Sequence, residues 1–176
     1  MTVTIGIFAL LFVLIVTFSI YIHRKNEVSG SSMEPTLSDG DSVYTTMLPY
    51  IFGDYKINDI VIIDIDLDSS WSYFHLFGQV FAKKNPDTFW IKRIVGLPGD
   101  ELRFEGNKYY RNGELVEENF IKDKNVLAYP VDTTIIVPEN CVYVMGDNRN
   151  VSKDSRDATV GPIPSYKIIG CMWKKS

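Results

Sequence analysis

The chain has 176 residues, of which 45% are hydrophobic and 23% are charged. This length and composition fit one packed domain with an additional segment, and they argue against a disordered chain. The net charge of −4 and the lack of a basic block argue against a nucleic-acid partner, because phosphate binding needs clustered lysines and arginines.

The first predicted element is a transmembrane anchor in residues 1–25. Residues 2–22 carry no charged side chain, and their length matches the roughly 20 apolar residues that cross a bilayer as a helix. A cleaved signal peptide is the alternative, but its apolar region would span about 7–15 residues behind a basic start. We therefore expect a retained anchor. Arg24 and Lys25 follow it, and the positive-inside rule alone would place the remaining residues in the cytoplasm.

Residues 26–176 are predicted to form one β-rich domain, because short apolar and β-branched runs alternate with turn residues. The expected strands are Ile57–Ile65, Phe89–Val95, Glu101–Tyr110, Glu114–Val116, Thr133–Val137 and Val142–Met145. Asn112-Gly113 is a strong signal for a hairpin turn. No long segment with helical periodicity follows the anchor. The fold class is therefore mostly β with a single transmembrane helix.

An aromatic segment, Trp71–Phe81, has five aromatic residues in eleven positions and no formal charge. One interpretation is a buried hairpin or core strand. The other is a surface that enters the lipid interface, where tryptophan and tyrosine are enriched. The sequence leaves both open.

The two cysteines, Cys141 and Cys171, each lie in an apolar stretch, which favours small buried residues over a disulfide. Neither His23 nor His75 has a partner at the spacing of metal ligands, so no metal site is expected.

A loop rich in serine and glycine follows the anchor, and Ser29–Leu37 reads SGSSMEPTL. A serine beside glycine can direct its hydroxyl and a free backbone N–H to the same point. Acyl transfer needs both groups, one as nucleophile and one as oxyanion donor. Taken alone, this loop is more typical of a linker.

Lys92 lies in the strand predicted for Phe89–Val95, and strand alternation places it on one face with Trp90 and Ile94. Burial disfavours the charged form of lysine, and a neutral amine can act as a general base. Arg93 lies on the opposite face, but its guanidinium stays charged and cannot be the base. Alternation does not decide which face is buried.

A third segment, residues 146–157, reads GDNRNVSKDSRD and follows a predicted strand. It is either a solvated loop or a set of hydroxyls and ion pairs that orients the base.

Together these segments resemble the type I signal peptidase family over essentially the whole chain. The family's Ser-Met-x-Pro-Thr-Leu motif is matched by Ser32–Leu37, and its strand motif by Asn58–Ile62. Its Lys-Arg-x-x-Gly-x-Pro-Gly-Asp motif is matched by Lys92–Asp100. Its last motif, Gly-Asp-Asn-Arg-x-x-Ser-x-Asp-Ser-Arg, is matched by Gly146–Arg156. Any one of these motifs is weak evidence, whereas four in order after an anchor are very specific.

The resemblance implies that Ser32 is the nucleophile, that Lys92 is the general base, and that the Ser152 hydroxyl hydrogen-bonds and orients Lys92. Some relatives have a serine as a second oxyanion donor where this chain has Gly30, so the Ser32 backbone N–H is the safer donor. The resemblance also implies supporting ion pairs and substrate contacts. The pairs are Asp154 with Arg156 and Asp147 with Arg93, and the substrate-binding residues are Met33 and Pro35.

The implied protein is a membrane-bound serine endopeptidase that needs no cofactor. Its substrates would be exported pre-proteins, cut after an A-x-A-like site of small residues. Its other expected partners are the lipid bilayer and a nearby secretion translocon. The catalytic domain must then face the extracytoplasmic side of the cell membrane, where substrates leave the translocon, and this requirement overrides the charge rule.

Two rival functions remain at this point. Self-cleaving repressors of the SOS response share a Gly-x-Ser-Met motif and a lysine base, but they carry a DNA-binding domain where this chain has an anchor. A catalytically silent, membrane-tethered interaction module is the other rival. Loss of Ser32 or Lys92 would indicate such a module, and the chain has both residues.

Overall fold

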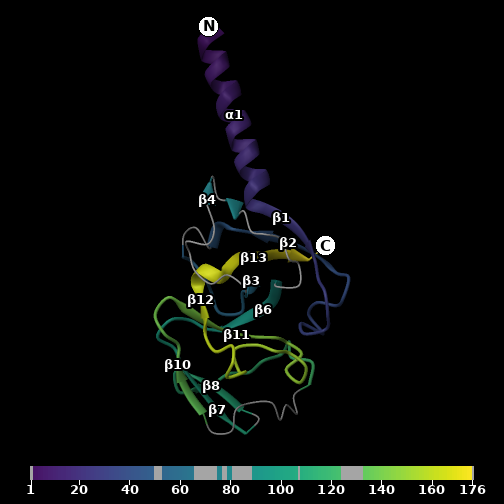
Figure 1. Ribbon diagram of the computed structural model, residues 1–176, viewed down its shortest axis with the longest axis vertical. Coiled ribbons are helices and arrows are strands. Elements are labelled where there is room, and N and C mark those ends of the chain that lie inside the picture. The colour runs from purple at the N-terminus through teal and green to yellow at the C-terminus, as the bar shows by residue number, and fades with distance from the viewer. Residues whose placement is uncertain are drawn as a thin grey trace.

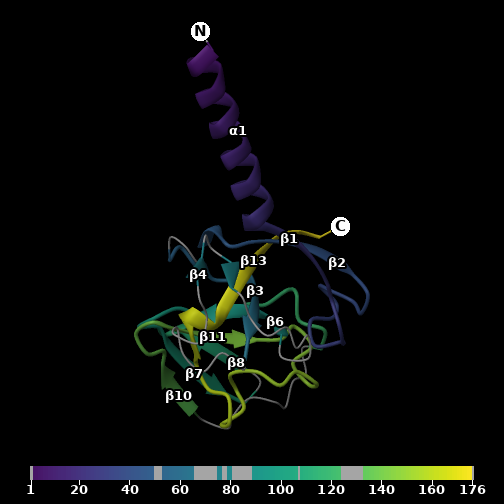
Figure 2. The ribbon, with the colours of Figure 1, turned by 45° about the horizontal axis from the view of Figure 1, so that its top comes forward.

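The computed structural model describes residues 2–49, 53–65, 75–76, 79–80, 89–106, 108–123 and 133–175. A helix, α1 (Thr2–Ile22), projects from a body built of strands, and the two views agree on this arrangement (Figures 1 and 2). Among the described residues, no helix is long and apolar enough to span a membrane. The anchor therefore stays a prediction.

A seven-stranded antiparallel sheet carries most of the body, in the order β1-β2-β13-β3-β6-β11-β12. Its strands are β1 (His23–Glu27), β2 (Ser42–Thr46), β3 (Ile60–Asp64), β6 (Phe89–Gly96), β11 (Cys141–Met145), β12 (Ile163–Pro164) and β13 (Ile168–Lys175). A single 3-10 turn, η2 (Ser165–Lys167), joins β12 to β13. Since β1 begins directly after α1, the predicted anchor region of residues 1–25 overlaps the first strand.

A smaller antiparallel sheet lies at the end of the body away from α1, in the order β10-β7-β8-β9 (Figure 1). Its strands are β7 (Glu101–Glu105), β8 (Lys108–Arg111), β9 (Glu114–Leu115) and β10 (Thr133–Ile136). The single strand predicted for Glu101–Tyr110 is wrong, because the chain turns back after β7 and pairs with itself. The hairpin at Asn112-Gly113 is confirmed, and both residues have the positive φ, 52° and 83°, that a tight two-residue turn requires.

Two short strands, β4 (His75–Leu76) and β5 (Gln79–Val80), pair with each other inside the aromatic segment. The rest of Trp71–Phe81 lies outside the described residues, so neither interpretation of that segment is tested.

Apolar side chains join the two sheets and also hold the serine loop. Val95, Tyr143 and Met145 from β6 and β11 pack against Leu102 and Phe104 of β7. The two cysteines are free, with Cys171 buried and Cys141 half-buried, as expected for small apolar residues. A separate cluster fixes the loop between β1 and β2 against β3; its members are Val28, Met33, Leu37, Val43 and Ile60.

Candidate active site

The serine loop is positioned by its apolar residues. Met33 and Leu37 are buried, and Leu37 N donates to Met33 O across one turn at 2.9 Å. Gly30 adopts φ +87°, a conformation that favours glycine, and its N–H donates to Asp39 Oδ1 at 2.7 Å. The half-buried Ser32 is therefore held between a buried methionine and a tethered glycine.

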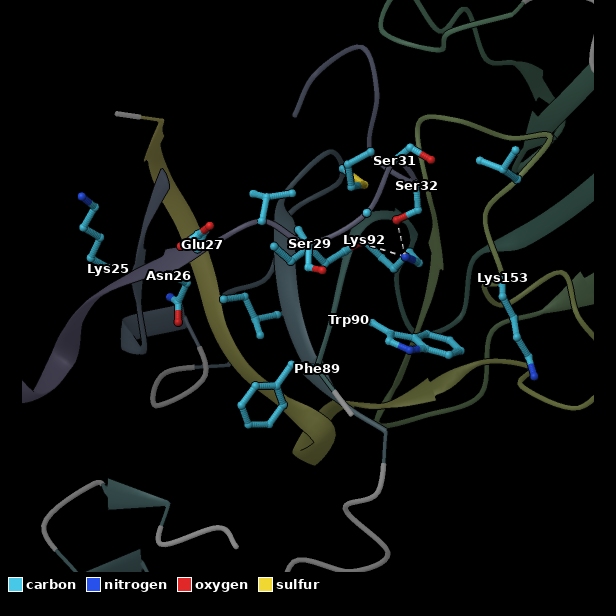
Figure 3. Close-up of a pocket in the computed structure, with 16 residues that line it drawn as sticks. Lys25, Asn26, Glu27, Ser29, Ser31, Ser32, Phe89, Trp90, Lys92 and Lys153 are labelled. Atoms are coloured by element: carbon cyan, nitrogen blue, oxygen red, sulfur yellow. Dashed lines mark hydrogen bonds between the residues drawn. The ribbon is translucent and has the colours of Figure 1, made fainter. Parts of the chain in front are cut away.

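Lys92 reaches Ser32 from β6. The Lys92 Nζ donates to Ser32 Oγ at 2.8 Å and to Ile91 O at 3.0 Å (Figure 3). The Nζ also lies 5.5 Å from the centre of the Trp90 ring. Strand pairing explains the approach, because β6 lies beside β3, and Ile60 of β3 packs with the serine loop.

Burial makes this amine easier to deprotonate. Only 4% of Lys92 is exposed, and burial lowers the pKa of Lys92 to about 8, although Asp154 acts against this shift. An ammonium group has three hydrogens to donate, and two of them find acceptors among the described residues. The structure therefore places an amine that deprotonates readily, that of Lys92, within hydrogen-bonding distance of the Ser32 hydroxyl.

The Ser32 backbone can supply an oxyanion donor. Ser32 O accepts a hydrogen bond from Asn148 N at 3.0 Å. Among the described residues, Ser32 N donates to no acceptor. A free N–H beside the nucleophile is the arrangement that stabilises a tetrahedral oxyanion. The Gly30 N–H, in contrast, is already bonded to Asp39.

The residues after β11 hold the serine loop in place through the backbone. Asn148 Nδ2 donates to Ser31 O at 3.0 Å, next to the bond from its own N–H to Ser32. Gly146 is required for this close approach. A Cβ at Gly146 would lie 2.5 Å from Ser32 O and 2.6 Å from Ser152 Cβ.

Arg93 and Asp147 form a buried, two-pronged ion pair. Arg93 Nε donates to Oδ1 at 2.8 Å, and the terminal nitrogen donates to Oδ2 at 2.7 Å. The register explains it, because Met145 pairs with Arg93 across β11 and β6, which brings Asp147 over the guanidinium. Thr36, at the end of the serine loop, also donates to Asp147. Strand β6, the serine loop and the segment after β11 are thus joined through one carboxylate.

Asp154 and Arg156 form the second expected pair. The Arg156 Nε lies 2.8 Å from Asp154 Oδ1, and Asp154 Oδ2 accepts the Gly146 N–H at 2.9 Å. This pair fixes the backbone at the glycine that contacts the serine loop.

The hydrogen bond expected from Ser152 to Lys92 is not formed. The Ser152 Oγ is buried and has no hydrogen-bond partner in the described part of the chain. It packs against Gly146, whereas the Lys92 amine uses the carbonyl of its own neighbour, Ile91. The prediction of a bonded orienting hydroxyl is therefore wrong for this structure.

A third buried pair was not anticipated from the sequence. Arg149 donates through both terminal nitrogens to Glu118, at 2.6 and 2.5 Å, and through Nε to Gly146 O at 3.0 Å. Glu118 lies in the segment after β9, and the two residues are far apart in the sequence. The charged side chain at 149 was visible, but nothing in the sequence pointed to its partner.

A cavity of about 590 Å³ opens over these groups. Ser32 and Lys92 line its middle, with Lys25 of β1 toward one side and Lys153 toward the other (Figure 3). Met33 contributes to the wall, whereas Pro35 is exposed and does not line it. Within the described residues, no group of three histidine, cysteine or acidic side chains could hold a metal ion.

Comparisons with known proteins show the family of the chain. The family described as signal peptidase, peptidase S26, matches residues 1–173. A signal peptidase I of Bacillus licheniformis is 33% identical over 150 residues, which cover 81% of this chain and 70% of that protein. Signal peptidase IB of Staphylococcus aureus is 28% identical over 177 residues, covering 92% and 82%. A signal peptidase I structure from Enterococcus faecalis has a similar fold, with a TM-score of 0.50, 22% identity, and coverage of 68% of this chain and 97% of that one.

Proposed function

Because the chain belongs to the signal peptidase family, peptidase S26, and is a serine endopeptidase, we propose that it removes signal peptides with a Ser32–Lys92 dyad while anchored in a membrane. The observation that carries the proposal is the 2.8 Å distance between Lys92 Nζ and Ser32 Oγ. It is supported by the burial that lowers the pKa of Lys92 to about 8.

In the first step, neutral Lys92 takes the proton from Ser32 Oγ while the oxygen attacks the scissile carbonyl. The tetrahedral oxyanion accepts a hydrogen bond from Ser32 N–H. Lys92, now an ammonium group, gives its proton to the departing amine, and the C–N bond breaks. Water then loses a proton to Lys92, attacks the acyl-serine, and frees the new carboxylate together with the Ser32 hydroxyl.

The walls of the same cavity support specificity for small residues. Apolar side chains from three parts of the chain, the serine loop, β3 and β6, line it beside Ser32: Val28, Met33, Ile62 and Ile91. An apolar wall built on a sheet and a buried loop accepts short aliphatic side chains. We propose an A-x-A-like cleavage site on this basis.

The anchor in this proposal is α1. Every described large apolar residue from Ile7 to Val16 is exposed on this helix, including Phe8 and Phe12 at 68% each. A helix that is apolar on all sides needs an apolar surrounding. The strand that continues it, β1, lines the cavity with Lys25 and Asn26, so the dyad lies close to the membrane end of the body. The substrates of such an enzyme emerge on the extracytoplasmic side, which is where we place the catalytic domain, beside the translocon.

The test is cleavage of a pre-protein by the full-length protein in detergent or in liposomes, with the new N-terminus identified by mass spectrometry. Wild type should cut at the signal-peptide junction, and Ser32→Ala should not. Ser38→Ala is a matched control, because Ser38 is exposed on the same loop and does not line the cavity. Cleavage that survives in Ser32→Ala would contradict the proposal. Failure of wild type to cut any pre-protein would favour a silent tethered module.

A further inference from the structure

A second cavity adjoins the candidate active site. It measures about 270 Å³ and shares two lining residues, Trp90 and Lys153, with the larger cavity. In Figure 3, Trp90 lies between the Lys25 end of the larger cavity and Lys153. A peptide that crosses the dyad can therefore continue past Trp90 into the second cavity.

This second cavity combines an apolar floor with positive charge. Val160, Ile163 and Pro164 form part of its wall, and Lys153 and Lys167 supply two ammonium groups. Lys167 Nζ donates to Ile65 O at 2.9 Å. In the described part of the chain, neither lysine forms an ion pair.

One nearby carboxylate interacts with Lys153, but in the described part of the chain the two groups form no ion pair. This carboxylate belongs to Asp157, and the charge of Lys153 is one of the causes that lower its pKa. It accepts hydrogen bonds from Thr159 N and Oγ1 at 2.8 and 2.7 Å, and these bonds lower the pKa of Asp157 more than Lys153 does. Both bonds are accepted by Asp157 Oδ1, and within the described residues Asp157 forms no ion pair with Lys153. The exposed Lys153 can therefore also bind a carboxylate of the substrate.

The direction of the substrate follows from the proposed function, on which this inference rests. A signal peptide stays with the membrane, and it precedes the scissile bond. Its end of the substrate must therefore lie over β1, next to α1. The leaving-group end, which is the start of the mature protein, then runs the other way, toward Trp90 and Lys153.

We propose that the cavity between Trp90 and Lys167 is a subsite for the leaving-group side of the substrate, and that Lys153 binds an acidic side chain there. The acidic residue lies within the first few positions after the scissile bond, because an extended chain advances only about 3.3 Å per residue. The apolar floor packs the aliphatic part of a glutamate, and the ammonium group meets its carboxylate.

The experiment uses full-length enzyme in detergent and synthetic peptides that span one cleavage site. Each peptide carries either glutamate or glutamine at one of the first four positions after the scissile bond. For wild type at low salt, kcat/KM for glutamate should exceed that for glutamine roughly two- to fivefold at one position, as for a partly exposed ion pair. The excess should shrink in high salt, which screens exposed charges.

Variants assign the effect to the lysine. The glutamate-to-glutamine ratio should fall to about one in Lys153→Met, and a peptide with lysine at the same position should gain in Lys153→Glu. Lys56→Met is the matched control, because Lys56 is exposed, pairs with Asp54 and lines neither cavity. It should keep the wild-type ratio.

Equal rates for every glutamate and glutamine pair in wild type would overturn the proposed subsite, as would a preference that persists in Lys153→Met. Neither result would touch the proposed function, which the glutamine peptides test separately. Their cleavage at the junction, and its loss in Ser32→Ala, depend only on the dyad.

Discussion

The two sheets use ion pairs in different ways. Around Ser32 and Lys92, the Arg93–Asp147 pair has side chains that are 9% and 0% exposed, and one edge of the guanidinium, Nε with a terminal nitrogen, faces the carboxylate. On the four-stranded sheet, Arg103 pairs with Glu105, and their side chains are 36% and 45% exposed. Both are arginine–carboxylate pairs, but the first joins three segments, whereas the second joins neighbours on one strand.

The contrast between the buried and the exposed pair shows that an ion pair can fix the geometry of a site without making the fold more stable. Removing two charges from water costs about as much as their attraction returns, so a buried pair is weak evidence for a more stable fold. It is strong evidence for a fixed arrangement, because breaking it leaves a charge stranded. The exposed pair is screened by solvent and fixes nothing beyond its own strand. The buried pairs therefore act to hold Ser32 and Lys92 in place, and the following predictions test that contrast.

The largest effect is expected at Lys92, the proposed general base. Lys92→Ala should lower kcat/KM by a factor of roughly 10²–10⁴, the range for loss of a general base. The double variant with Ser32→Ala should be no worse than either single variant, because the two residues act as one unit. Steady-state cleavage of a pre-protein measures this. If Lys92→Ala retained more than about a tenth of the wild-type rate, another group would have to be the base.

The next effect concerns the Arg149–Glu118 pair, which links the segments that follow β9 and β11. Glu118→Ala should destabilise the protein by about 3–5 kcal/mol, because it leaves the buried Arg149 guanidinium without its carboxylate. Denaturant unfolding measures the loss. Cleavage should also fall under conditions where the protein is folded, since Arg149 holds Gly146 O and, through it, the segment behind Ser32. A loss below about 1 kcal/mol would mean that water reaches Arg149.

The contact between Ser32 and Lys92 could be predicted from the sequence because short local patterns contain both residues. Ser32 lies in a motif, and Lys92 lies in an apolar β-branched strand that packs on both faces. The sequence did not reveal β1, whose residues His23–Glu27 are polar and show no alternation, because pairing with β2 rather than burial defines that strand. Glu118 was missed since its partner is brought near only by the tertiary fold. The prediction of a hydrogen bond from Ser152 to Lys92 was wrong because packing against Gly146 determines where the Ser152 hydroxyl lies.

A smaller effect should appear in the pH dependence of stability. The folded pKa of Lys92 is about 8 against 10.5 for the free side chain, so the unfolded chain binds more protons between these values. Wild-type stability therefore rises with pH across this window, and the penalty is fully present below pH 8. Lys92→Met lacks this term. Its stability relative to wild type should fall by roughly 2 kcal/mol between pH 7 and pH 10, at about 1.36 kcal/mol per pKa unit.

Denaturant melts of both proteins across this range test the prediction, with Lys56→Met as an exposed control. The comparison depends on the change with pH, since Lys92→Met also loses the bonds to Ser32 and Ile91 at every pH. A constant difference between the two proteins would show that Lys92 is solvated. In that case the cleavage rate should also show no rise toward an apparent pKa near 8.

The smallest effect is expected for the exposed pair. Glu105→Ala should change the free energy of unfolding by less than about 1 kcal/mol, since solvent screens a surface ion pair. Arg103 keeps its other contact in this variant, because its guanidinium lies 4.2 Å from the centre of the Tyr110 ring. Cleavage should equal that of wild type, and salt should remove most of the small stability difference. If Glu105→Ala cost as much as Glu118→Ala, burial would not be what distinguishes the two sheets, and the rigidity of the dyad would need another source.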